Sequence, residues 1–112
     1  MSKDTKKYLL TDFYGEDYYL VPIMTTYHNN GRLAILLYDE DDEVFCDMTV
    51  NIPNGKLSGT KNAFIDTNNS PWLVSFIKKH QLARPTGQYA MSGYCLYPEY
   101  EFDLSKLNSD NQ

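Results

Sequence analysis

The sequence predicts an α+β protein in which an antiparallel sheet of about five strands carries one helix packed on one face. Two observations lead to this fold class. Several segments alternate apolar and polar residues with a period of two, and sequences rich in Gly, Asn and Asp separate them. One further segment repeats its apolar residues at helical spacing. At 112 residues we expect a single domain over 1–112, with flexible polar ends at 1–7 and 107–112.

The first two expected strands are residues 8–13 and 18–27, with a turn at 15–17. The second strand is rich in aromatic and β-branched residues, but it contains Pro22. Proline has no N–H to donate, so we predict that this strand is an edge strand or is bulged there. Residues 28–31 read His-Asn-Asn-Gly and predict a hairpin turn, since Asn and Gly tolerate positive φ.

The third and fourth expected strands enclose an acidic run. Residues 32–38 are nearly continuous apolar, which is typical of a central strand covered on both faces. Residues 44–52 alternate along their whole length and predict one strand. The run between these strands consists of five consecutive acids: Asp39, Glu40, Asp41, Asp42 and Glu43. Five acids cannot all be buried, so they predict a solvated turn.

The helix is expected after a short strand at 63–66. Pro71 suits a first helical position, and the Asn and Ser residues before it suit an N-cap. The face predicted to be apolar consists of Trp72, Leu73, Phe76, Ile77 and His80. Pro85 ends the helical pattern, and residues 86–93 predict a loop with two glycines.

Residues 94–104 alternate again and predict the last strand. The inward set is expected to be Tyr94, Leu96, Tyr100, Phe102 and Leu104. Of the outward set, Glu99, Glu101 and Asp103 would form a second acidic stripe on a solvent-facing side.

The charge and the cysteines restrict the classes of function. The net charge is −5, which argues against direct binding of nucleic acid, because phosphate contacts need clusters of Lys and Arg. An acidic surface suits a basic protein partner. The N-terminal residues show no secretory signal and no apolar run is long enough to cross a membrane, so we expect a cytoplasmic protein with Cys46 and Cys95 reduced. The ten tyrosines, several on expected edge strands, leave a homodimer open.

The sequence predicts no catalytic residues, no cofactor site and no metal site. It contains no nucleophile elbow, phosphate-binding glycine loop or His-Glu-x-x-His motif. The acidic run lacks the glycine and the spacing of a calcium loop. Two interpretations of the run remain, a hairpin tip charged for solubility or a partner-binding surface. In the second, the contact residues are Asp39, Glu40, Asp41, Asp42, Glu43 and Asp47.

Several short segments carry a resemblance to a known family. They are Thr-Val-Asn-Ile-Pro at 49–53, Ala-Phe-Ile-Asp-Thr-Asn-Asn at 63–69, Pro-Thr-Gly at 85–87, Ser-Gly-Tyr-Cys at 92–95 and Tyr-Pro at 97–98. Together they resemble the domain of unknown function numbered 4313, over roughly residues 30–107. The family has no assigned reaction, so the resemblance implies a setting and no catalytic residues. That setting is the mobile elements of Gram-positive bacteria, often beside anti-restriction genes.

The chain is also similar in size and character to anti-CRISPR proteins that act on Cas9. The sequence-level hypothesis is therefore a non-enzymatic inhibitor of type II Cas9 that works in the bacterial cytoplasm. It would bind Cas9, or its guide-bound form, and interfere with guide RNA loading or DNA binding. The alternative is another mobile-element accessory protein, such as an anti-restriction or conjugation-associated binding protein. An enzyme that uses the carboxylates with a metal is a third hypothesis.

Overall fold

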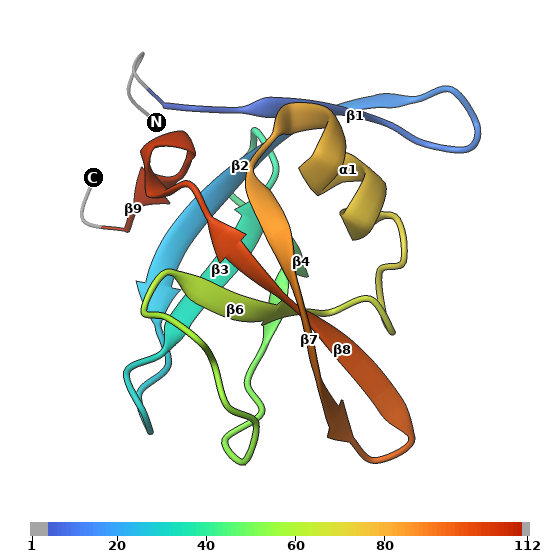
Figure 1. Ribbon diagram of the computed structural model, residues 1–112. Helices are drawn as coiled ribbons and strands as arrows, with labels where there is room; N and C mark the ends of the chain where they lie inside the picture. Colours follow the sequence, from blue (N-terminus) through green and yellow to red (C-terminus); the bar gives the residue numbers. More distant parts are fainter. Residues whose placement is uncertain (1–4, 111–112) are drawn as a thin grey trace.

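The computed structural model describes residues 5–110, which form two β-sheets and one short α-helix (Figure 1). The first sheet contains β1 (Tyr8–Thr11), β2 (Asp17–Thr26), β3 (Leu33–Tyr38) and β4 (Val44–Asp47), and β9 (Asn108–Ser109) pairs with β2. The second sheet has the order β5 (Thr49–Val50), β6 (Asn62–Ile65), β8 (Cys95–Phe102) and β7 (Ala83–Ser92). All pairings are antiparallel except β2 with β9. The α+β class is therefore broadly correct, but the expected five strands were too few.

The predicted strand at 44–52 is two strands that belong to different sheets. The chain leaves the first sheet at Met48, whose N–H donates to the Ile35 carbonyl at 2.9 Å. The Met48 carbonyl accepts from the Asp66 N–H at 3.0 Å, just beyond β6 in the second sheet. Because Met48 is fully buried and bonded on both sides, it joins the two sheets without leaving a main-chain group unpaired.

Pro22 lies inside the first sheet, where we had predicted an edge or a bulge. On one side β2 pairs with β3 without a register shift, and on the other it pairs with β1 up to Leu20 and with β9 from Ile23. Pro22 falls in the gap between β1 and β9. Its carbonyl accepts from the side chain of buried Asn108 at 3.0 Å. The N–H and C=O groups of one residue point to the same side of a strand, so the N–H that proline lacks would have pointed into this gap. No hydrogen bond of the ladder with β3 is therefore lost.

The helix α1 (Leu73–His80) confirms the predicted amphipathic segment, but its predicted start is wrong: Trp72 is the N-cap residue, no side chain among the described residues caps the helix, and Pro71 lies before it. Leu73, Phe76 and Ile77 are buried in the main core, and Trp72 and His80 pack at its edge. The helix ends at Gln81, which adopts the left-handed conformation (φ 55°). The main core also takes residues from both sheets and from the segments that join them: Leu20, Ile35, Leu37, Met48, Ala63, Ile65, Leu82, Tyr100, Phe102 and Leu107.

Of the segment at 86–93, predicted as a loop, residues 86–92 belong to strand β7 and Gly93 lies in the turn that follows. The ladder of β7 with β8 is interrupted between Pro85 and Tyr89, where Gly87 has a φ of 90°. Residues 107–110 also differ from the flexible tail that we expected at 107–112. After the 3₁₀ turn η1 (Leu104–Lys106), Leu107 is buried and β9 pairs with β2. Residues 1–4 and 111–112 lie outside the described residues.

Candidate functional site

The predicted acidic contact forms one exposed turn between β3 and β4, which we call the acidic tip (residues 39–43). Asp39 organises it: its N–H donates to the Glu43 carbonyl at 2.8 Å, and its Oδ1 accepts from the N–H groups of Asp41 (2.8 Å) and Glu43 (3.0 Å). Asp42 adopts the left-handed conformation (φ 63°), which Asp tolerates better than most residues. Residues 40–43 are exposed. The turn therefore has an ordered backbone and presents its carboxylates to solvent.

Asp47 does not join this tip. It is exposed at the opposite end of β4, roughly 13 Å along the strand from Glu43. Within residues 5–110 one acid of the tip forms an ion pair: Glu40 Oε2 lies 2.9 Å from Lys7 Nζ. Both side chains are about half exposed, so this pair contributes less than about 1 kcal/mol to stability. No group of three or more metal-ligating side chains occurs in the described part of the chain.

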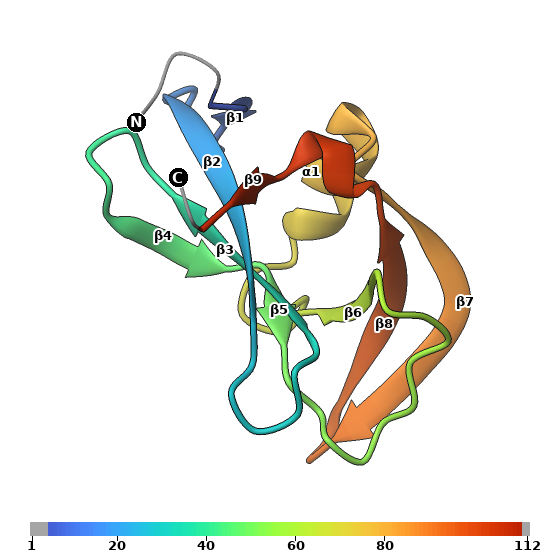
Figure 2. The same ribbon diagram turned by 90° about the vertical axis from the view of Figure 1, so that its left-hand side faces the viewer.

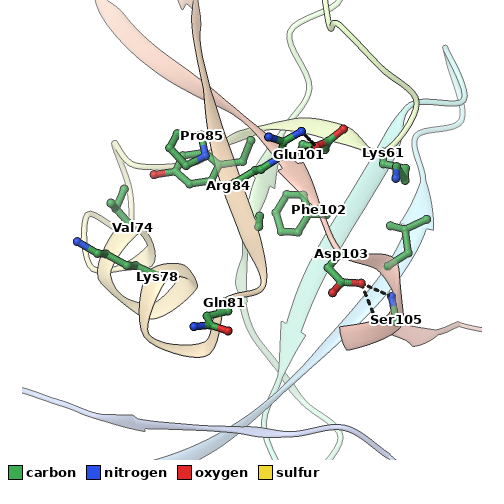
Figure 3. A pocket seen from close by; sticks show the side chains of 13 residues that line it. Lys61, Val74, Lys78, Gln81, Arg84, Pro85, Glu101, Phe102, Asp103 and Ser105 are labelled. Atoms are coloured by element: carbon green, nitrogen blue, oxygen red, sulfur yellow. Dashed lines mark hydrogen bonds and ion pairs between the residues drawn. The ribbon is translucent and has the colours of Figure 1, made fainter.

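A second feature is a groove of about 990 Å³ between the end of α1, strands β7 and β8, and the turn η1 (Figure 3). Its rim carries charges of both signs, and Arg84 Nε donates to Glu101 Oε1 at 2.6 Å. Asp103 Oδ1 accepts from the hydroxyl (2.6 Å) and the N–H (3.1 Å) of Ser105, and these bonds hold the pKa of Asp103 below its usual value. Both carboxylates of the groove are therefore already engaged by neighbouring side chains.

The predicted acidic stripe of Glu99, Glu101 and Asp103 is wrong at Glu99, which is fully buried. Its Oε2 accepts from the Ser58 N–H (2.8 Å), the Ser58 hydroxyl (2.8 Å) and the Asn62 amide (2.6 Å). Its Oε1 accepts from the Thr86 hydroxyl at 3.0 Å. Burial alone raises a carboxyl pKa, but the bonds from Asn62, Ser58 and Thr86 prevail and lower the pKa of Glu99. Glu99 is thus an anion that ties the β5–β6 loop, β6 and the β7 bulge together.

This burial follows from the way β8 uses its two faces. Near its end, Tyr100 and Phe102 face the main core, as predicted. Nearer its start, Tyr97 faces a second core, formed with Ile52, Phe64 and Ala90. Glu99 lies on the same face as Tyr97, under the β5–β6 loop. No local sequence signal marks Glu99, because its partners are 13 to 41 residues away along the chain.

The other face of the β7–β8 hairpin is apolar and exposed. Tyr94 and Leu96, predicted to point inward, are 105% and 54% exposed, and Tyr89 and Met91 on β7 are 59% and 68% exposed. Met91 lies directly opposite Leu96 in the ladder. The hairpin extends beyond the main core (Figure 1), so nothing among the described residues covers this face. We call these four side chains the hairpin face.

Residues 23–111 match the family described as a domain of unknown function, DUF4313. The chain belongs to this family. No curated protein and no solved structure matches the chain. The DUF4313 region begins within β2 and includes the acidic tip, Glu99 and the hairpin face. Its description names no reaction and no partner, so the link to mobile elements and to CRISPR inhibition stays a prediction. No helix within residues 5–110 is long and apolar enough to cross a bilayer.

Proposed function

We propose that this protein is a non-enzymatic inhibitor that binds Cas9 through its acidic tip. The observation that carries the proposal is the geometry of the tip. Asp39 fixes the backbone of the turn from within, and the remaining acids project from it. A fixed cluster of carboxylates can enter a basic groove with little further ordering, and this reduces the entropic cost of binding.

The proposed mechanism is competition for a positively charged surface. Cas9 holds its guide and target in a positively charged channel that contacts the nucleic-acid backbone. Carboxylates this close together repel one another, and a row of Lys and Arg side chains would relieve that repulsion. Opposite fields also accelerate the encounter, so the inhibition should weaken as the salt concentration rises. Asp47, at the far end of β4 from the tip, would make a separate contact.

The experiment is a DNA cleavage assay with Cas9 from a Gram-positive bacterium, with the protein added before or after the guide RNA. Inhibition only when the protein precedes the guide supports competition for the guide channel. Equal inhibition in both orders places the block at DNA binding. No inhibition across several Cas9 orthologues would refute the proposal and favour the anti-restriction or conjugation role.

Two triple variants test whether the tip makes the contact. The first is Asp41→Asn, Asp42→Asn and Glu43→Gln, which keeps the Asp39 bonds and the Glu40–Lys7 pair. We expect it to inhibit about tenfold less well, since close charge pairs at an interface contribute at least this much.

The control removes three exposed acids elsewhere, by Glu16→Gln, Asp17→Asn and Asp110→Asn. Both variants lose three negative charges, so a difference between them reports the position of the charge and not the net charge. Equal inhibition by the two variants would show that the tip is not the contact.

A further inference from the structure

The outer edge of β7 is open and carries no charge beyond Arg84. β7 is the last strand of the second sheet, and among the described residues only β8 pairs with it. Residues 85–98 contain no Asp, Glu, Lys, Arg or His, although the chain has 25 Asp, Glu, Lys and Arg residues. Exposed edge strands are ordinarily protected by charged side chains, by covering segments or by bulges. Here a bulge lies at 86–88, but residues 89–92 beyond it form a regular ladder with β8.

The main-chain groups that face this open edge are identified by the hairpin. Gly93 and Tyr94 form a two-residue loop, so Ser92 and Cys95 close it as a hydrogen-bonded pair. Hydrogen-bonded and non-hydrogen-bonded pairs then alternate along the ladder, so Tyr89 and Pro98 form a non-hydrogen-bonded pair. This position suits Pro98, because proline has no N–H to donate. The N–H and C=O groups of Tyr89 and Met91 therefore point away from β8, toward the open edge.

We propose that two copies of this chain dimerise by antiparallel pairing of their β7 edges. A two-fold axis perpendicular to the sheet at Ala90 places Tyr89 of each copy opposite Met91 of the other. Both residues have outward main-chain groups, so the two pairs form four hydrogen bonds. Residues directly opposite in an antiparallel ladder share a face, so Tyr89 and Met91 of both copies form one continuous apolar surface. In one chain β7 lies at the outer edge of the second sheet (Figure 2). In the dimer the sheet would run through both chains, with the two β7 strands at its centre.

Charge favours a second copy as the occupant. Two chains that each carry −5 repel over most of their surfaces, and the uncharged edge lets them approach with the least repulsion. Pairing at this edge brings Tyr89 and Met91 of the two copies together, whereas Leu96 on β8 and Tyr94 in the turn lie away from the β7 edge. The contact is therefore small, below the ~600 Å² per partner of standard specific complexes, and is typical of a weak association. We therefore expect a dissociation constant of about 10 μM.

The first test is the mass in solution, measured by sedimentation equilibrium from about 1 μM to about 100 μM, a range that spans this dissociation constant. We expect the mass to rise from that of one chain toward that of two. Met91→Lys should weaken the dimer at least about tenfold, because it places a charge in the uncharged segment 85–98. Val74→Lys adds the same charge to an exposed position on α1 and should leave the dimer unchanged. A chain that stays monomeric up to 100 μM, or equal effects of the two lysines, would overturn the proposal.

The second test reads the register by disulfide trapping. Cys46 and Cys95 are first replaced by Ser, and Tyr89→Cys and Met91→Cys are made in separate chains. The proposed pairing puts position 89 of one copy about 5.5 Å from position 91 of the other between Cα atoms, which is within disulfide range. Cross-links should form when the two variants are mixed and not when each is oxidised alone. Cross-linking of either variant with itself, or none in the mixture, would contradict this pairing.

Discussion

Replacing Glu99 is expected to destabilise the fold more than replacing any other acid in β8. In Glu99→Ala, the buried Asn62 amide and the partly buried Ser58 N–H lose their shared acceptor, and the amide keeps one bond, to the Ser58 hydroxyl at 3.0 Å. Each buried donor left without a partner costs about 1–3 kcal/mol. The hydroxyls of Ser58 and Thr86 belong to exposed residues and can turn to water. The variant should therefore lose about 3 kcal/mol of unfolding free energy, a large share of the 5–15 kcal/mol typical of a small domain.

The charge of Glu99 also makes a prediction about pH. Its folded pKa lies below the ordinary value of 4.5, so the carboxylate stabilises the fold above pH 4.5. That contribution is lost as the pH falls through the folded pKa, because protonation removes the acceptor of the charged hydrogen bonds. Glu99→Gln keeps the shape without the charge. It should be about 1–2 kcal/mol less stable than the wild type at pH 7, and this difference should shrink below pH 4.5.

The assay is urea unfolding at a series of pH values, followed by the fluorescence of Trp72, the one tryptophan of the chain. Glu101→Ala is the matched control, two residues further along the same strand. Glu101 pairs with Arg84, whose side chain is 80% exposed, so its loss should cost less than about 1 kcal/mol. If Glu99→Ala costs no more than Glu101→Ala, the four bonds to Glu99 do not hold the loop and the reasoning fails.

Two further substitutions test local features of the same fold. Gly55→Ala should lower the unfolding free energy by about 1–3 kcal/mol, since the new Cβ would lie 2.8 Å from the Ala90 Cβ and 3.0 Å from the Phe64 ring. The control Asn54→Ala, in the same loop, should change the unfolding free energy by less than about 0.5 kcal/mol. Equal costs would show that the loop does not press on the second core. Gln81→Gly should raise the unfolding free energy by about 0.5 kcal/mol because Gln81 has a φ of 55°, and Gln81→Ala, which keeps a Cβ, should give no such gain. A gain with Ala as large as that with Gly would contradict this origin.

The local elements of the fold could be predicted because their causes are local. The spacing of Leu73, Phe76 and Ile77 defines a helical face in any context, and that face is buried. The acidic tip follows equally from composition, since five adjacent acids have no buried alternative. The sequence pattern could not show to which of the two sheets each strand belongs. Nothing between Val44 and Ile52 interrupts the alternation, and the division at Met48 depends on bonds to residues 13 and 18 positions away.

The error at Glu99 has a related physical cause. A period of two assigns the residues of a strand to two faces. It does not show that one face can be buried in one half of the strand and the other face in the other half. β8 does so because the β5–β6 loop covers the half that the main core leaves open. On that covered face a carboxylate is tolerated only where donors converge, and Ser58, Asn62 and Thr86 supply them. The same half of the strand leaves Leu96 on the outside.

The two proposed contacts lie in different sheets and depend on different physical forces. The acidic tip belongs to the first sheet, and its attraction to a basic partner should fall with salt. The β7 edge belongs to the second sheet and is uncharged, so pairing there should not weaken with salt and should strengthen where screening reduces the repulsion between two acidic chains. Salt therefore separates the two surfaces without a mutation. The N-terminal segment before the family match also affects the tip. Lys7 pairs with Glu40 and so reduces the negative charge that the tip presents to a partner.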